Sequence, residues 1–297
     1  MPFQRSVDYS YPDAVATAKL QGSCREGDWT QVQELLLRSS NQSDGSWTLA
    51  LRDAMMNHHI DIMQSLLDSN VTIDSRVVEE ARSVEAFTLL FEHGLDIHQN
   101  LSLRRVPLIY VLHVVQKDDE TLLRWFLALG ANPNFGPDPD PEKEHDDSAY
   151  IDTSGAVLER ASNSASPAII DILLEHGANL HNSRAIHEAL YRDTSADVIE
   201  MLDHLVKRGA DVNHLAIHMR GFRWGARLLN IAAEIGRLEP IQWLLEHGAA
   251  PTATDRYGIP PCCSTQLLKN DEADKLLSDA YNKKLRASSE GNANGDA

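Results

Sequence analysis

The chain has 297 residues, with 27 basic and 44 acidic side chains, so its formal net charge at pH 7 is -17. A charge of this sign repels phosphate backbones and anionic lipid, which argues against general binding to nucleic acid or to a membrane surface. Three cysteines, two of them adjacent in sequence, suggest no disulfide framework and favour a reducing compartment, the cytosol or the nucleus. No apolar run is long enough to predict a secretory leader or a membrane-spanning helix.

Residues 1–13 are predicted to be an N-terminal extension, and residues 14–287 carry a recurring pattern. A similar phrase returns as SLLDSNVTI at 65–73, LLFEHGLDI at 89–97, FLALGANPN at 126–134, LLEHGANL at 173–180, LVKRGADVN at 205–213 and WLLEHGAAP at 243–251. Its marker position is glycine in five copies and Asn70 in the first, and the spacing scatters around a period of roughly 33 residues. The pattern predicts one elongated domain built from repeated units rather than a single central core.

Two insertions interrupt the pattern, at about 135–150 and 214–226. The first, FGPDPDPEKEHDDSAY, is rich in proline and acid, which predicts a solvated, extended segment. An alternative is an electrostatic lure for a basic partner, formed by Asp138, Asp140, Glu142, Glu144, Asp146 and Asp147. The second insertion leads into HMRGFRWGAR at 218–227, where arginines and aromatic residues reverse the acidic character of the chain.

The most complete unit ends at Gly248. Helical spacing predicts a first helix over about 227–235 and a second over about 239–246, with Gly236 in the turn between them. Gly248 is expected to adopt the left-handed conformation that ends a helix. Prolines near the start of two second helices, Pro167 and Pro240, fit the same register. The tail at 288–297 is small and polar, which predicts disorder.

These segments resemble the ankyrin repeat family. The closest matches to its first-helix motif are VPLIYVL at 106–112, AIHEAL at 185–190 and LLNIAA at 228–233, and DRYGIPP at 255–261 resembles the turn that opens a unit. The resemblance covers most of residues 14–280 in degenerate form. It implies an all-α fold, an ankyrin-repeat solenoid of about seven to eight stacked helix-turn-helix units with irregular capping repeats.

Thirteen histidines do not form a ligand pattern, since no HExxH, paired CxxC or phosphate-binding glycine loop is present. His93, His176 and His247 each precede a marker glycine, which predicts a structural role at a helix C-terminus. The resemblance implies a structural role for His187 as well. Cys262 and Cys263 are interpreted as small packing residues near the C-terminal cap. No catalytic motif, metal or cofactor is predicted.

Candidate partner-binding residues come from three places. The insertion loop offers aromatic and arginine side chains of the kind that dominate interface energies, namely Arg220, Phe222, Arg223 and Trp224. Turn tips add Arg104, Arg105, Arg256 and Tyr257. The first exposed position after the alanine-like pair of each first helix gives a concave column, Met56, His113, Asn163, Tyr191 and Glu234, with Arg25 at its start.

Three functions remain open at this stage. The first is an ankyrin-type module, acting as an adaptor, scaffold or inhibitor, that binds a protein partner through its concave groove and loop tips. The second is a small-molecule-binding or catalytic protein, in which His113, Tyr191 and Glu234 converge on a pocket and supply proton transfer. The third is the acidic lure of the first insertion. Solvated or packed side chains are the structural alternative for every candidate residue.

Overall fold

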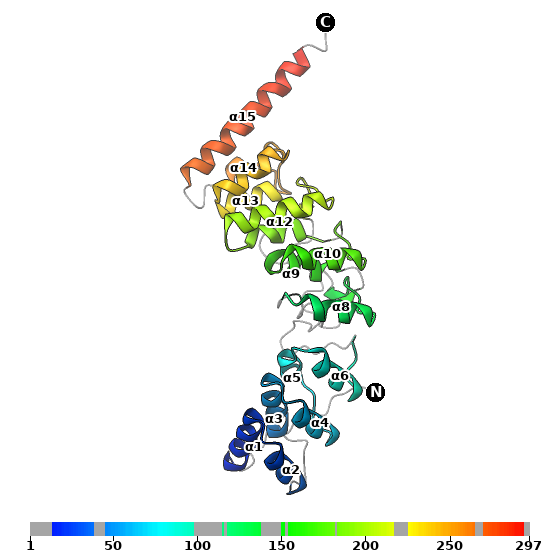
Figure 1. Ribbon diagram of the computed structural model, residues 1–297. Helices are drawn as coiled ribbons and strands as arrows, with labels where there is room; N and C mark the ends of the chain where they lie inside the picture. Colours follow the sequence, from blue (N-terminus) through cyan, green and yellow to red (C-terminus); the bar gives the residue numbers. More distant parts are fainter. Residues whose placement is uncertain are drawn as a thin grey trace. The chain divides into compact units, whose positions relative to one another are not determined.

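The computed structural model in Figure 1 describes residues 14–38, 45–97, 115, 118–137, 150–151, 154–181, 183–216, 225–264 and 270–293. Helices make up most of this part of the chain, which confirms the predicted all-α class. The chain divides into two compact units, Met1–His113 and Val114–Ala297. Among the described residues, no helix is both long and apolar enough to cross a membrane.

The helices of the N-terminal unit are arranged in consecutive pairs. Its helices are α1 (Ala14–Glu26), α2 (Trp29–Arg38), α3 (Gly45–Met56), α4 (Ile60–Asp68), α5 (Ser75–Glu80) and α6 (Val84–Glu92). Within the first two pairs, α1 packs on α2 and α3 packs on α4. First helices also contact first helices, α1 with α3 and α3 with α5, while α4 contacts both α2 and α6. Each pair is therefore covered by the pair that follows it in the chain.

The C-terminal unit continues this order. Its elements are α8 (Glu120–Ala128), β1 (Gly136–Pro137), β2 (Tyr150–Ile151), α9 (Ala156–Ser164), α10 (Pro167–Glu175), α11 (Ala185–Glu188), η2 (Ala189–Tyr191), α12 (Ser195–Lys207), β3 (Leu215–Ala216), β4 (Ala226–Arg227), α13 (Leu228–Ile235), α14 (Leu238–Glu246), η3 (Pro261–Cys263) and α15 (Asp271–Ala293). Helix α9 contacts α11, α11 contacts α13, and α13 contacts η3. On the other side of the pairs, α8 contacts α10, and α12 contacts α14, which contacts α15.

The second helices end in a common way, as the recurring phrase predicts. In α10, the amide of Ala178 donates to the carbonyl of Leu173 across 2.9 Å, and Gly177 has a φ of +89°. The same bond and left-handed marker residue occur after α4, α6, α8, α12 and α14, with Asn70 at φ +59° in the first case. This is the capping arrangement that favours glycine, so the prediction for Gly248, with φ +87°, is confirmed.

Histidine side chains make a further hydrogen bond at three of these helix ends. The Nδ1 atoms of His93, His176 and His247 each donate to the carbonyl four residues earlier, across 2.8 Å. Each of these carbonyls also accepts from the backbone amide of the same histidine, so the ring adds a second hydrogen bond in the last helical turn. The predicted structural role of these three histidines is confirmed.

Two asparagines join neighbouring repeats in the C-terminal unit. Asn134 donates from Nδ2 to the carbonyl of Gly177 (2.8 Å) and accepts from the amide of Asn179 (2.8 Å). Asn213 makes the same pair of contacts two repeats further on, with the carbonyl of Gly248 (3.1 Å) and the amide of Ala250 (2.9 Å). Both lie four residues after a marker glycine, so the recurring phrase also supplies the contacts between units.

Each predicted insertion is bounded by two short strands that pair with each other in an antiparallel ladder. Gly136 pairs with Ile151 around the first, and Leu215 pairs with Arg227 around the second. Residues 138–149 and 217–224 lie outside the described part of the chain, so the acidic lure is untested. The predicted helices at about 227–235 and 239–246 match α13 and α14.

The last helix passes the boundary that we predicted for the repeat domain. Helix α15 runs to Ala293, whereas the sequence analysis places residues 288–297 in a disordered tail. Its first half is anchored by Ala273 and Leu277, which are fully buried. Helix propagation adds one hydrogen bond for each further residue, and Ser288, Ser289 and Glu290 oppose it only weakly, whereas Gly291 opposes it more strongly. The predicted tail therefore overlaps the last six residues of this helix.

Candidate partner-binding surfaces

A turn in the C-terminal unit presents the most exposed of the predicted residues. Asp255 accepts hydrogen bonds at Oδ1 from the amides of Tyr257 (2.8 Å) and Ile259 (2.9 Å), which holds the predicted turn in place. The Tyr257 side chain is 64% exposed, and the Arg256 guanidinium lies over its ring at 5.1 Å from the centroid. Such a pair offers a large flat surface and a cation together.

This turn adjoins the C-terminal end of the second insertion. The Arg256 amide donates to the carbonyl of Gly225 across 2.9 Å. Gly225 has a φ of +73°, and a Cβ there would lie within 2.8 Å of the Arg256 side chain. The close approach therefore requires glycine at this position. The predicted loop residues Arg220, Phe222, Arg223 and Trp224 lie outside the described residues, but the chain leaves this loop directly beside Arg256 and Tyr257.

Arg227, which closes the loop, has a structural role. Its Nη1 donates to the carbonyl of Asn213 (2.8 Å) and its Nε to the carbonyl of Thr254 (3.0 Å). The side chain thus ties together the start of the hairpin, its end and the segment that leads to the 255–259 turn. Both of these acceptors are backbone carbonyls.

The concave column of the C-terminal unit spans three successive first helices. Asn163 lies at the end of α9, Tyr191 ends η2, and Glu234 lies near the end of α13. Tyr191 is 45% exposed, whereas Asn163 and Glu234 are half-buried. These helices contact one another in series. His113, a predicted member of the column that belongs to the N-terminal unit, lies outside the described residues, as do Arg104 and Arg105.

The N-terminal unit carries a row of ion pairs on its first helices that the sequence analysis missed. Arg25 Nη2 lies 3.2 Å from Asp53 Oδ2, joining α1 to α3. Arg52 Nε lies 3.6 Å from Glu80 Oε1, joining α3 to α5. The acid follows the arginine by 28 positions in both pairs (25 to 53, 52 to 80). This repeated spacing is the signal that would have found them.

In each of these pairs the carboxylate lies deeper than the arginine. Asp53 is 10% exposed against 58% for Arg25, and Glu80 is 18% exposed against 62% for Arg82, which also contacts it at 3.3 Å. Met56, a predicted site residue, is 41% exposed at the end of α3. The outermost atoms of this row are therefore guanidinium groups and one thioether side chain.

A different kind of ion pair lies inside the C-terminal unit. Arg184 donates to Glu159 from its backbone amide, from Nε (3.1 Å) and from Nη2 (2.6 Å), and the two side chains are 18% and 12% exposed. Burial raises the pKa of the neighbouring Glu188, and the negative charge of Glu159 raises it further. A pair that is buried on both sides and fully hydrogen-bonded ties α9 to α11 rather than facing a partner.

The remaining titratable groups give no reactive centre. His187 is fully buried with its ring 5.6 Å from that of His214, and burial, followed by the charge of His214, lowers its pKa to about 3. Burial raises the pKa of the Cys24 thiol to about 12, and the charge of Asp53 adds to the effect. Among the described residues, no three His, Cys, Asp or Glu side chains gather as metal ligands would.

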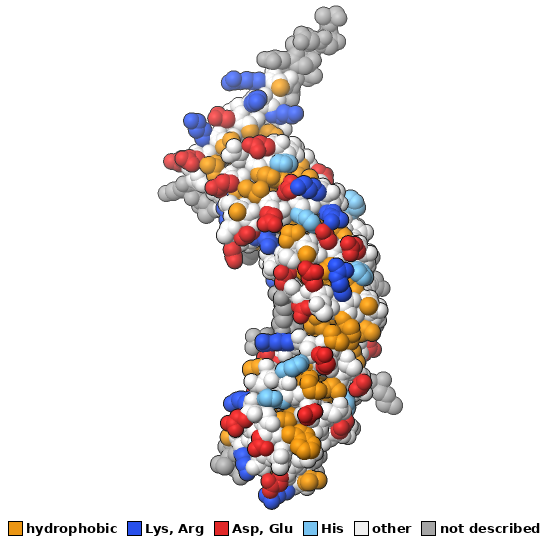
Figure 2. Space-filling view, in the orientation of Figure 1, with side chains coloured by type: hydrophobic (Ala, Val, Ile, Leu, Met, Phe, Trp, Pro, Cys, Tyr) orange, Lys and Arg blue, Asp and Glu red, His pale blue; other side chains and the backbone are white. Residues whose placement is uncertain are grey.

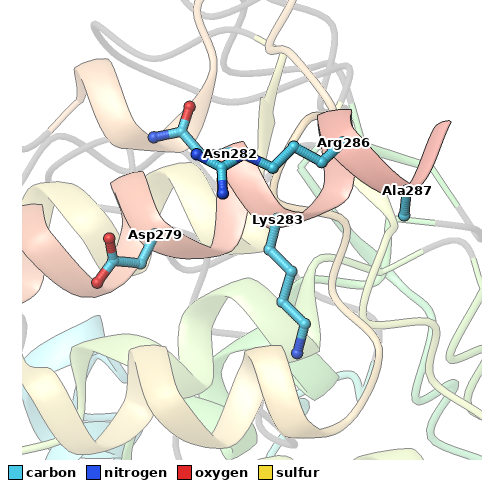
Figure 3. A pocket seen from close by; sticks show the side chains of 5 residues that line it. All are labelled: Asp279, Asn282, Lys283, Arg286 and Ala287. Carbon is cyan, nitrogen blue, oxygen red and sulfur yellow. The ribbon is translucent and has the colours of Figure 1, made fainter. Parts of the chain in front are cut away.

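A pocket lies along the last helix. Figure 3 shows that its labelled lining residues all belong to α15, at positions that recur on one side of a helix: Asp279, Asn282, Lys283, Arg286 and Ala287. None of them belongs to the concave column. Figure 2 shows basic side chains along α15 and side chains of both signs over the visible face of each unit.

Comparison with models of known protein families gives no match to this chain, and no curated protein matches its sequence significantly. The resemblance to ankyrin repeats therefore stays a prediction that depends on the recurring residues of this chain.

Proposed function

We propose that the chain is a degenerate ankyrin-type repeat protein whose function is to bind a protein partner. Three features support the repeat assignment: second helices that end alike, helix pairs that contact the next pair in order, and two asparagines, two repeats apart, that make the same bonds to the next repeat. Repeat proteins of this kind use extended surfaces for recognition rather than a single enclosed site. The chain would then act as an adaptor, scaffold or inhibitor.

The observation that carries the proposal is the exposed turn at 255–259 beside the second insertion. A tyrosine that is 64% exposed, with an arginine guanidinium over its ring, offers the two side-chain types that contribute most to the energy of protein interfaces. The neighbouring loop adds Phe222, Arg223 and Trp224 from the sequence. We propose that the loop and the turn form one binding surface, extended by the concave column through Tyr191.

The experiment is affinity capture from the native cell extract with matched variants. Tyr257→Ala should lose a captured protein that the wild-type chain retains, and Trp224→Ala with Arg223→Ala should lose the same protein. Gln242→Ala, on an exposed face of α14, is the control. Unchanged capture by all variants, with unchanged thermal stability, would remove the loop and turn from the mechanism.

We also propose that the protein works in the cytosol or the nucleus. Cys24 is a buried free thiol, and the other two of the three cysteines, Cys262 and Cys263, are adjacent in sequence. Free thiols of this kind persist in reducing compartments. Imaging of a tagged chain in its native cells tests this.

A further inference from the structure

The first helices of the N-terminal unit carry a second surface with a distinct chemistry. Arg25, Met56 and Arg82 lie at the C-terminal ends of α1, α3 and α5, in the order in which those helices contact one another. Arg25 is the second-last residue of α1, Met56 is the last residue of α3, and Arg82 follows the last residue of α5 by two positions. All three side chains are more than one third exposed. The row therefore reads cation, apolar side chain, cation across three successive helix pairs.

Less exposed carboxylates hold the arginine side chains of this row in position. Asp53 lies under Arg25, and Glu80 lies between Arg52 and Arg82 with contacts of 3.6 and 3.3 Å. Because each carboxylate is less exposed than its arginine, each ion pair is a dipole whose positive end faces solvent. Oriented dipoles of this kind attract anions at short range although the pair as a whole is neutral. A guanidinium held in this way also loses less side-chain entropy when it binds.

We infer that this row binds an extended, acidic protein segment with an apolar residue at its centre, an inference that rests on the proposed function as a protein-binding module. Neighbouring helices pack about 8–10 Å apart, so the outer arginines are separated by roughly 16–20 Å. An extended chain rises about 3.3 Å per residue, so its two acidic ends are about five or six residues apart. Carboxylates bind the guanidinium groups, and the apolar residue covers Met56.

The choice of an acidic protein segment follows from charge. The chain as a whole carries a net charge of -17, which opposes a polyanion such as nucleic acid. A short acidic segment can bind the exposed guanidinium groups, and because it carries few charges it is repelled less by the rest of the chain than a polyanion is. A phosphate group has no apolar part to cover Met56 at the centre of the row. An apolar side chain of a protein segment can pack against the flexible thioether of Met56.

The test uses the full chain and a fluorescein-labelled peptide, DDSLSDD, measured by fluorescence anisotropy. Arg82→Gln is the main variant, because Glu80 keeps its contact with Arg52 and the fold is not left with an unpaired buried carboxylate. Loss of one charge-assisted contact should weaken binding by about tenfold. Met56→Ser should also weaken it, and added salt should weaken it for the wild type.

Controls make the outcome specific. Arg38→Gln removes an arginine from the N-terminal unit whose partner, Glu34, lies on the same helix, α2, and should leave binding unchanged. The peptides KKSLSKK and DDSSSDD should bind weakly or not at all. The inference is overturned if DDSLSDD does not bind, if Arg38→Gln and Arg82→Gln weaken it equally, or if a single-stranded oligonucleotide binds more tightly than the peptide.

This result is separable from the proposed function. Capture that depends on Tyr257, together with no binding of DDSLSDD, would overturn only the inference about the N-terminal unit. Loss of DDSLSDD binding in Arg82→Gln, together with capture that is insensitive to Tyr257, would overturn the loop surface and leave the arginine row in place.

Discussion

In the C-terminal unit the Glu159–Arg184 pair is closed off from solvent, with both side chains less than one fifth exposed. In the N-terminal unit Arg25 and Arg82 stand outside their carboxylates, each more than half exposed. Arginine–carboxylate pairs thus join neighbouring first helices in both units, through Arg184 in one and through Arg25 and Arg52 in the other, but only in the N-terminal unit are guanidinium groups exposed where a partner can reach them. Burial, rather than residue type, separates a structural ion pair from a binding surface.

The largest expected effect on stability is at the buried Glu159–Arg184 pair. Arg184→Ala removes both guanidinium donors and the positive charge from the buried Glu159 carboxylate and leaves it only the backbone amide of residue 184. We therefore expect the free energy of unfolding to fall by about 3 kcal/mol. Arg82→Ala, at an exposed pair, should change it by no more than about 0.5 kcal/mol. Urea denaturation followed by circular dichroism measures both. Equal losses in the two variants would contradict the distinction.

A second contrast lies in the contacts between repeats. Asn213→Ala removes two hydrogen bonds to the next repeat, which should cost about 2 kcal/mol, and Asn134→Ala should cost a similar amount. Both are measured by thermal or chemical unfolding. Asn163→Ala, in the concave column, is the control and should change stability little. A negligible effect at both Asn134 and Asn213 would remove them from the account of how repeats are joined.

A third prediction concerns pH in the N-terminal unit, where His93 Nε2 lies 3.0 Å from Asp68 Oδ1. Burial alone would lower the pKa of His93, but hydrogen bonds to the Leu89 carbonyl and to Asp68 raise it above its usual value. The hydrogen bond from His93, followed by that from Gln64, lowers the pKa of Asp68. The pair therefore stabilises the fold between the usual pKa values of the two groups, about 4 and 6.5.

The contribution of His93 is lost as pH rises through its folded-state pKa, and that of Asp68 is lost as pH falls through its own. His93→Gln should therefore destabilise the protein more at pH 5.5 than at pH 8.5, as measured by urea unfolding at both values. His176→Gln removes the same contact to a helix carbonyl in the C-terminal unit and is the matched control. A loss at His93 that grows with pH would contradict the assignment.

The smallest effect concerns the one repeat end without glycine. Asn70 holds the left-handed conformation at φ +59° where five other repeats place glycine. Asparagine tolerates this region better than most residues, but glycine adopts it without strain. Asn70→Gly should raise the free energy of unfolding by roughly 0.5 kcal/mol. Ser69→Gly, at a position with negative φ, should lower it instead.

The recurring phrase was enough to predict the helices of the most complete unit, the left-handed glycines and the histidines at helix ends. These features depend on neighbours within about five residues, so sequence spacing carries them. The ion pairs of the N-terminal unit were missed because each joins residues 28 positions apart, and the pattern of single units does not show them. The structural contacts of Arg227 could not be predicted for a related reason, since its charge is visible in the sequence but its backbone acceptors are not.

The concave column was only partly informative. Equivalent positions did place Asn163, Tyr191 and Glu234 on successive first helices, but the degree of exposure differs among them. Exposure depends on the size of the neighbouring side chains and on where each helix ends, as at η2, where the last turn is tighter than an α-helix. Those details are set by packing rather than by register.

The most direct test of the central claim, that exposed turn and loop residues bind a protein partner, is site-specific photocrosslinking in native cell extract. A benzophenone side chain replaces Tyr257 in one variant and Gln242, on an exposed face of α14, in the other. The account predicts a discrete adduct of higher mass from position 257 and none from position 242. Adducts of equal yield from both positions, or none from position 257 while the protein remains folded, would contradict it.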